Sequence, residues 1–239
     1  MSVSEARVDG TIAGETQIGK TLDETALAHV DASPLALDDF LVRARTRLLP
    51  EPDLSGDPAR GDHELTPEHR ALVDALDWRA AAVLIPVIAR ERPSVLLTMR
   101  SAHLKSHPSQ IAFPGGRIDP GDAGPLDAAL REAHEEVGLA RDLVTPLGYL
   151  DPYLTRTGFR IIPVVGVVKP EFGLTLNPDE VDEAFEVPLD FLMSPGNHER
   201  HSREAQGLLR TFHAMAYEGR FIWGVTAGIL RSLYERVYV

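Results

Sequence analysis

The sequence contains no cysteine, so disulfide bonds, thiol nucleophiles and zinc sites with cysteine ligands are all excluded. It also lacks an apolar run approaching the ~20 residues that a membrane-spanning helix requires. The first thirty residues carry Glu5, Asp9 and Glu15 and no apolar segment of the kind found in secretory signals. These absences predict a cytoplasmic protein with no membrane association.

Positive charge is scarce, because 24 basic residues stand against 36 acidic ones and give a formal net charge of −12 at pH 7. This balance disfavours long nucleic acid as a partner, since such binding depends on basic side chains that neutralise phosphates. Residues 93–118 reverse the balance: they contain no Asp or Glu but carry Arg100, Lys105 and Arg117. A solvated loop would explain this segment, but its position directly before an acidic helix favours binding of an anion.

The 239 residues are 44% hydrophobic and 25% charged, which is typical of a globular protein. Hydrophobic periodicity and helix-end signals predict helices at 34–48, 68–76, 125–137 and 226–236. Runs rich in β-branched residues predict strands at 81–89, 95–99, 144–150, 161–168, 184–187, 212–216 and 220–223. We therefore predict an N-terminal tail, helix and linker over residues 1–66 and a main domain over residues 67–239.

The helix predicted at 125–137 carries an unusual cluster of acids. Glu132, Glu135 and Glu136 crowd one flank, and each like-charge pair at this spacing costs roughly 0.2–0.5 kcal/mol. They also lie in the last turns, where the helix dipole disfavours negative charge. Clustered violations of local rules usually mark a functional site. Carboxylate oxygens are the ligands of Mg²⁺ or Mn²⁺, and these ions bind phosphate oxygens in turn.

This stretch, which reads GGRIDPGDAGPLDAALREAHEEVGL, resembles the Nudix box of pyrophosphohydrolases, G-x5-E-x7-R-E-U-x-E-E-x-G-U, where U is a bulky apolar residue. The matching positions are Gly116, Arg131, Glu132, Glu135, Glu136, Gly138 and Leu139. The middle acid departs from the pattern. Five residues separate Asp122 from Gly116, as in the pattern, but eight residues rather than seven separate it from Arg131. The resemblance therefore leaves the role of Asp122 open.

A second resemblance lies immediately upstream, where residues 96–116 read LLTMRSAHLKSHPSQIAFPGG. This segment is similar to the pattern LLTxRSx3Rx3Gx3FPGG of the coenzyme A pyrophosphatase branch of Nudix hydrolases. Lys105 replaces an arginine of that pattern, and Ser109 replaces a glycine. The resemblance implies that Arg100, Ser101 and Lys105 bind the 3′-phosphate or the pyrophosphate of coenzyme A.

Three further residues of this segment are candidates for substrate binding. Gly115 and Gly116 let the backbone approach the phosphates, although an ordinary turn would also explain the pair. Phe113 is a candidate for packing on the adenine, and a place in the hydrophobic core explains it equally well.

The resemblance implies an α/β fold, the Nudix α/β/α sandwich with a mixed β-sheet, preceded here by an N-terminal helical extension. It also implies a metal-dependent hydrolase that cleaves coenzyme A or acyl-CoA to 4′-phosphopantetheine, or its acyl form, and adenosine 3′,5′-bisphosphate. Glu132 and Glu136 would be the principal ligands of Mg²⁺ or Mn²⁺, and Glu135 would join directly or through water. Arg131 would orient these glutamates. The general base stays open among Glu132, Glu135, Glu180 and Glu183.

Several alternatives remain. Another Nudix hydrolase would act on ADP-ribose, nucleotide sugars or dinucleotide polyphosphates, and a Nudix-like binding module would have lost turnover. Residues 14–21 also match the phosphate-binding pattern G-x4-G-K-[ST], but the preceding segment makes a poor buried strand, so we interpret the match as chance. A small-molecule substrate is the expected partner, and a homodimer is left open.

Overall fold

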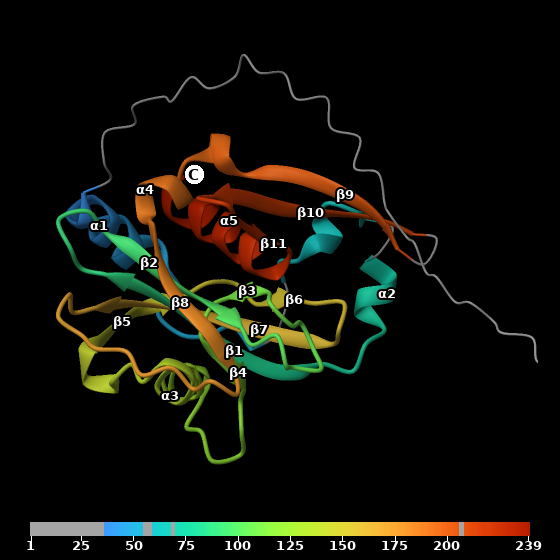
Figure 1. The fold of residues 1–239 in the computed structure, drawn as a ribbon. Coiled ribbons are helices and arrows are strands. Elements are labelled where there is room, and N and C mark those ends of the chain that lie inside the picture. The colour runs from blue at the N-terminus through green and yellow to red at the C-terminus, as the bar shows by residue number, and fades with distance from the viewer. Residues whose placement is uncertain (1–35, 55–58, 68–69, 206–207) are drawn as a thin grey trace, which may run out of the picture. The chain divides into compact units, whose positions relative to one another are not determined.

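Two long parallel strands form the centre of the main sheet in the computed structural model, which describes residues 36–54, 59–67, 70–205 and 208–239 (Figure 1). They are β1 (Arg79–Ile88) and β7 (Phe159–Val168), paired along their whole length. Their apolar, largely β-branched side chains are mostly buried, as expected of central strands covered on both faces. The pattern at residues 14–21 lies outside the described residues.

Antiparallel strands flank this pair and make the sheet mixed, as predicted. On one side β2 (Ser94–Arg100) pairs with β1, and β8 (Val181–Pro188) pairs with β2. On the other side β5 (Val144–Tyr149) pairs with β7. Three short strands complete the sheet: β3 (Ile111–Ala112) beside β2, β4 (Gly115–Arg117) beside β1, and β6 (Tyr153–Leu154) beside β7.

Proline cannot donate a hydrogen bond to a neighbouring strand and is usually confined to edge strands or bulges, but Pro163 lies in β7, which is an interior strand. Its neighbours explain how the proline is tolerated. Strand β6 pairs with Arg160 and Ile161, whereas β5 pairs only from Val164 onward. Pro163 therefore falls at the break between these two partners.

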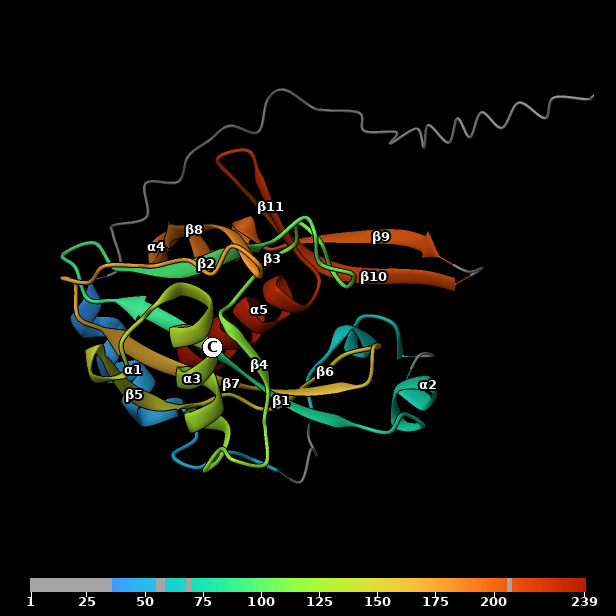
Figure 2. The ribbon, with the colours of Figure 1, turned by 60° about the horizontal axis from the view of Figure 1, so that its bottom comes forward.

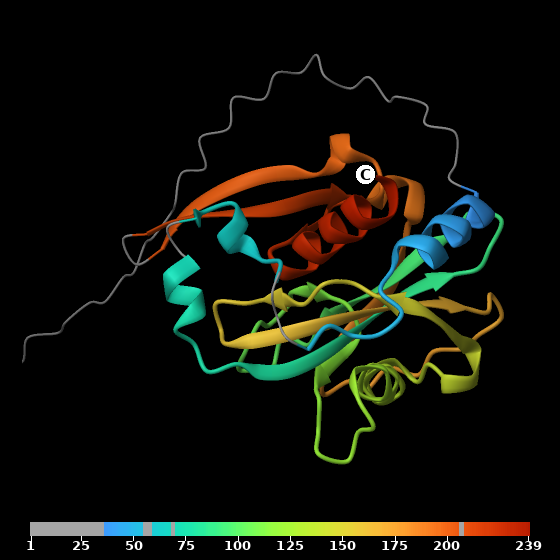
Figure 3. The same ribbon diagram turned by 180° about the vertical axis from the view of Figure 1, so that it is seen from behind.

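Helices cover both faces of the sheet (Figure 3). On one face α3 (Pro125–Val137) buries Ala129, Ala133 and Val137 against the sheet. On the other face α1 (Leu37–Arg47) and α5 (Val225–Tyr238) share one apolar core that includes Phe40 and Leu233. This arrangement confirms the α/β/α fold with a mixed sheet and an N-terminal helix. Helix α1 packs into the core of the sheet, and the boundary at residues 66/67 stays a prediction.

A second, three-stranded antiparallel sheet consists of β9 (Glu199–Ala205), β10 (Leu208–Tyr217) and β11 (Arg220–Trp223). The sequence predicted β11 and a shorter β10, but it gave no sign of β9. The residues of β9, ERHSREA, are almost all polar, because β9 is an edge strand with one neighbour in its sheet. Backbone pairing rather than apolar burial therefore defines this strand.

The remaining elements are short. They are α2 (Arg70–Asp74), α4 (Leu189–Leu192) and the 3₁₀ turns Asp62–Glu64, Arg141–Leu143 and Pro195–Asn197. Within the described part of the chain, no helix has the length and apolar character needed to cross a membrane.

Candidate active site

Helix α3 carries the glutamates to a fixed place beside the short strand β4 (Figure 2). As predicted, Pro125 occupies the first helical position and Gly138 ends the helix in the left-handed conformation, at φ 71°. The amide of Gly138 closes the last turn by donating to the carbonyl of His134 at 2.9 Å. The acidic flank of the helix faces Gly115 and Gly116 of β4, which adjoin Glu136 and Glu132.

Arg131 is the centre of a hydrogen-bond network on this flank. Its guanidinium donates to both carboxylate oxygens of Asp122, at 2.9 and 3.0 Å. It also donates to Glu132 at 3.0 Å, to Glu135 at 3.1 Å and to the carbonyl of Arg117 at 3.1 Å. These contacts hold Glu132 and Glu135 beside Arg131, and its role in orienting them stays a prediction.

Asp122, whose role the sequence left open, is the acid most firmly bound to Arg131. Its side chain is only 4% exposed, and the hydrogen bond from Arg131 lowers its pKa to about 2. The amide of Asp119 donates to the same carboxylate at 2.7 Å. The segment between Asp122 and Arg131 is one residue longer than in the Nudix pattern, and the Asp122 carboxylate nevertheless contacts Arg131.

Glu132 and Glu136 lie directly behind the glycine pair. Glu136 is 4% exposed, accepts a hydrogen bond from the amide of Gly115 at 3.2 Å, and has its pKa raised to about 8 by burial. A Cβ on Gly116 would meet the carboxylate of Glu132 at 2.5 Å, and one on Gly115 would collide with the Ala82 carbonyl. A side chain at Gly115 would thus meet fixed backbone, whereas one at Gly116 would displace the end of the flexible Glu132 side chain.

The carboxylate oxygens of Glu132 and Glu136 are suitable ligands for a divalent cation. Burial raises the pKa of Glu132 as well as that of Glu136, and the charge of Glu180 raises both further. A bound cation would relieve this desolvation and repulsion. Glu135 is turned toward Arg131 instead, and the described residues contain no group of three or more acids or histidines arranged to hold a metal. Glu132 and Glu136 are thus the pair that fits.

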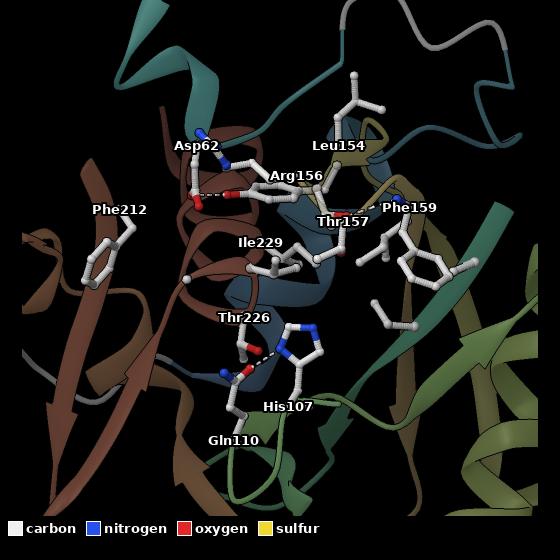
Figure 4. Close-up of a pocket in the computed structure, with 18 of the residues that line it drawn as sticks. Asp62, His107, Gln110, Leu154, Arg156, Thr157, Phe159, Phe212, Thr226 and Ile229 are labelled. Atoms are coloured by element: carbon white, nitrogen blue, oxygen red, sulfur yellow. Dashed lines mark hydrogen bonds between the residues drawn. The ribbon is translucent and has the colours of Figure 1, made fainter. Parts of the chain in front are cut away.

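A cavity of about 830 Å³ lies beside the glycine pair. Figure 4 shows other residues of its lining, among them Asp62, Arg156 and Phe159. Gly115 and Gly116 belong to its wall, whereas the glutamates lie behind them and outside the lining. Six arginines line it: Arg79, Arg100, Arg117, Arg156, Arg203 and Arg210. Among the described residues of the lining, Asp62 is the one acid. The cavity therefore has the charge required by a ligand that carries several negative charges.

Comparison with known proteins agrees with this arrangement. The model of the NUDIX domain matches residues 78–209 of the chain. The chain belongs to the Nudix family. A relative named "Uncharacterized Nudix hydrolase NudL" from Citrobacter koseri is 40% identical over 210 residues, which cover 88% of this chain and 99% of the relative. The protein of the same name from Enterobacter sp. is 38% identical over 204 residues, or 85% of this chain and 96% of that one.

Solved structures also match at lower identity. A MutT/nudix family protein from Enterococcus faecalis is 18% identical and has a TM-score of 0.44, with 84% of this chain and 69% of that chain covered. DR0079 from Deinococcus radiodurans is 16% identical with a TM-score of 0.45, and the match covers 69% of this chain and 87% of that one.

The structure brings only some of the expected substrate-binding residues of this Nudix protein to the cavity. Arg100, Phe113, Gly115 and Gly116 line it. The buried Nε of Arg100 has no hydrogen-bond partner among the described residues, which suits contact with a ligand. Phe113 is 4% exposed and packs in the hydrophobic core, so the core interpretation accounts for its burial.

Ser101 and Lys105 are placed elsewhere. The Ser101 side chain is completely buried, and its amide donates to the carbonyl of Glu180 at 2.8 Å, so it supports the loop. Lys105 is exposed and does not belong to the cavity lining. The substrate-binding roles expected of Ser101 and Lys105 stay predictions. The burial of Ser101 and the position of Lys105 outside the cavity lining do not favour them.

The sequence did not reveal the other cationic residues of the cavity. Arg79 begins β1, Arg156 lies between β6 and β7, and Arg203 and Arg210 face each other across β9 and β10. No spacing along the chain connects these four positions, because only the fold brings them together.

Proposed function

We propose that this Nudix protein is a metal-dependent hydrolase that cleaves the pyrophosphate of coenzyme A or acyl-CoA. The products would be 4′-phosphopantetheine, or its acyl form, and adenosine 3′,5′-bisphosphate. One observation carries the proposal: the carboxylates of Glu132, which is partly buried, and of Glu136, which is buried, lie directly behind Gly115 and Gly116, and these glycines belong to the lining of a cavity that also contains six arginines. We place this activity in the cytoplasm on the basis of the composition.

Nudix hydrolases generally need divalent metal ions. Here Glu132 and Glu136 would hold Mg²⁺ or Mn²⁺, and Glu135 would join only by leaving Arg131, to which it is hydrogen-bonded in this structure. Such an ion lowers the pKa of a bound water and neutralises negative charge on the phosphates. Arg131 fixes the orientation of Glu132 and thereby keeps one ligand in place.

The chain itself would supply the binding of the phosphates. Gly115 and Gly116 belong to the cavity lining and also adjoin the glutamates, so phosphate oxygens bound in the cavity beside them would lie near Glu132 and Glu136. Arg100 lies near enough to Glu136 to lower its pKa, and it also lines the cavity. Arg100 would therefore bridge between the carboxylates and the pyrophosphate of the substrate.

The substrate is supported by the charge of the cavity and by the coenzyme A pyrophosphatase-like segment at residues 96–116. Coenzyme A carries a 3′-phosphate in addition to its pyrophosphate, and ADP-ribose lacks it. A cavity with six arginines and one acid suits the more highly charged molecule.

The test is the rate of phosphoanhydride cleavage for coenzyme A, an acyl-CoA, ADP-ribose, a nucleotide sugar and a dinucleotide polyphosphate under one metal condition. We expect the highest kcat/KM for coenzyme A or the acyl-CoA. Preference for ADP-ribose or another diphosphate would overturn the coenzyme A assignment and leave a Nudix hydrolase of different specificity. No cleavage of any of them, by a folded and metal-loaded protein, would indicate a binding module.

A further inference from the structure

Strand β9 is an open edge of the three-stranded sheet. It pairs with β10 on one side, and no described strand lies on its other side. Figure 2 shows β9 on the outer side of β10. Its polar side chains are largely exposed, namely those of Glu199, Arg200, Ser202, Arg203 and Glu204. Such an edge is a template for a further strand, because its outward N–H and C=O groups have no strand to bind.

The direction of the backbone groups along β9 follows from Thr211 on β10. Its amide donates to Oγ1 of Thr66 at 3.4 Å and is therefore turned away from β9. Thr211 lies directly opposite Ser202. In an antiparallel ladder, opposite residues exchange two hydrogen bonds or none, and the two kinds of pair alternate. The N–H and C=O groups of Ser202, and those of Arg200 and Glu204 two residues away, therefore point to the open edge.

Edge strands are usually protected against pairing with other chains, and β9 lacks three common protections. Its sequence, ERHSREA, contains neither proline nor lysine, and its register with β10 runs without a bulge. Its remaining protection is charge. Charged side chains prevent pairing only where like charges meet, so the order of the charges along β9 decides whether two copies can pair.

The charges of β9 are self-complementary about Ser202, its middle residue. Antiparallel pairing with a second copy about a two-fold axis at Ser202 places Arg200 opposite the partner's Glu204 and Glu204 opposite the partner's Arg200. These are residues whose backbone groups point to the edge, so hydrogen bonds and opposite charges coincide. Parallel pairing in register would instead bring like charges together. An axis at His201 would also pair opposite charges, but it would leave the end of the strand unpaired.

We propose that two copies of this chain associate through their β9 edges, in antiparallel register centred on Ser202. The result is a two-fold symmetric dimer in which a continuous antiparallel sheet receives three strands from each copy. Main-chain hydrogen bonds supply the affinity, and the pairs of Arg200 with Glu204 fix the register. A single strand pair covers less surface than the ~1,600 Å² of a standard interface, so we expect the dimer to dissociate on dilution.

The first experiment measures the mass of the full chain in solution. Sedimentation equilibrium should show the mass rise from that of one chain toward that of two as the protein concentration increases. Arg200→Glu should weaken the association at least tenfold, because it sets like charges opposite each other at both pairs. The double variant Arg200→Glu/Glu204→Arg restores opposite charges and should dimerise like the parent. Arg203→Glu is the matched control, since it makes the same charge change on β9 but leaves the pairs of Arg200 with Glu204 intact, and it should not weaken the dimer.

The second experiment tests the backbone pairing. Ser202→Pro removes an N–H group that points to the open edge, so it should weaken the dimer about tenfold and leave the Tm close to that of the parent. A parent that stays monomeric at every concentration would overturn the proposal. A dimer that Arg200→Glu and Ser202→Pro leave unchanged would do the same, because its interface would lie on another surface. Equal weakening by Arg200→Glu and Arg203→Glu would show that net charge, and not this register, controls association, and would also overturn the proposal.

Discussion

Asp122 presents both carboxylate oxygens to the guanidinium of Arg131, at 2.9 and 3.0 Å, and is almost completely buried there. Arg131 in turn holds Glu132, a proposed ligand of the metal. A bidentate contact of this kind fixes both distance and angle. The position of Glu132 therefore depends on an acid in the loop that precedes the helix.

The first prediction follows from this contact. Asp122→Asn keeps the size of the side chain but removes the charge that fixes Arg131. We expect a loss of about 1–3 kcal/mol in the free energy of unfolding, measured by urea denaturation, and at least a tenfold lower kcat. Asp119→Asn is the matched control, because its exposed carboxylate lies 3.8 Å from the same guanidinium and should matter little. Equal effects of the two substitutions would contradict a special role of Asp122.

The second prediction concerns metal and stability. Adding Mg²⁺ or Mn²⁺ at about 100 times Kd should stabilise the native state by about 2.7 kcal/mol, which corresponds to roughly 5–10 °C in Tm for a domain of this size. The Glu132→Gln/Glu136→Gln double variant should lose this gain and all turnover. It should also melt higher than the metal-free parent, because two partly or fully buried carboxylates no longer require desolvation. Glu135→Gln is the control, and equal metal shifts in the parent and the double variant would place the ion elsewhere.

The third prediction distinguishes two acids that the sequence left equivalent as general bases. Glu180 is close enough to raise the pKa of both Glu132 and Glu136, whereas Glu183 accepts an ion-paired hydrogen bond from Arg220 on β11. Glu180→Gln should lower kcat by about 10²–10⁴ if it removes the proton acceptor. Glu183→Gln should leave kcat within a factor of about three. The measurement is kcat at saturating substrate and metal, and the reverse order would exclude Glu180 as the base.

The sequence predicted the parts of the site that are local. The ends of α3 are marked by Pro125 and Gly138, and the three glutamates conflict with helix electrostatics in a way that is visible without a structure. The arginines of the cavity are a different case. Arg79, Arg156 and Arg210 are far apart in the sequence, and β9 lacks the apolar alternation that identifies a strand. Their convergence depends on tertiary packing, which periodicity does not encode.

The fourth prediction concerns the loop between β2 and β3. Ser109 stands where the related pattern has glycine, and it adopts the left-handed conformation with φ 55°. A side chain with a Cβ is strained in this region, so Ser109→Gly should raise the free energy of unfolding by about 1 kcal/mol. Ser109→Ala retains the Cβ and should give no such gain. Chemical denaturation of the three proteins at one pH is the measurement, and a destabilised Ser109→Gly variant would show that the hydroxyl outweighs the strain.

The last prediction is the dependence of stability on pH through His213, on β10. Burial, together with the charges of Arg231 and Arg200, lowers its pKa to about 4. The folded protein thus holds the imidazole neutral, while the unfolded chain takes up a proton near pH 6.5. The contribution of His213 to stability is therefore complete above about pH 6.5 and is lost as the pH falls from there toward 4, with a slope of at most about 1.4 kcal/mol per pH unit. His213→Gln does not titrate, so its free energy of unfolding should fall less steeply than that of the parent between pH 6.5 and 4.5, and the two curves should run parallel above pH 7. Urea denaturation at half-unit pH intervals measures both slopes. Curves that stay parallel down to pH 4.5 would show that His213 does not cause the loss of stability at acid pH.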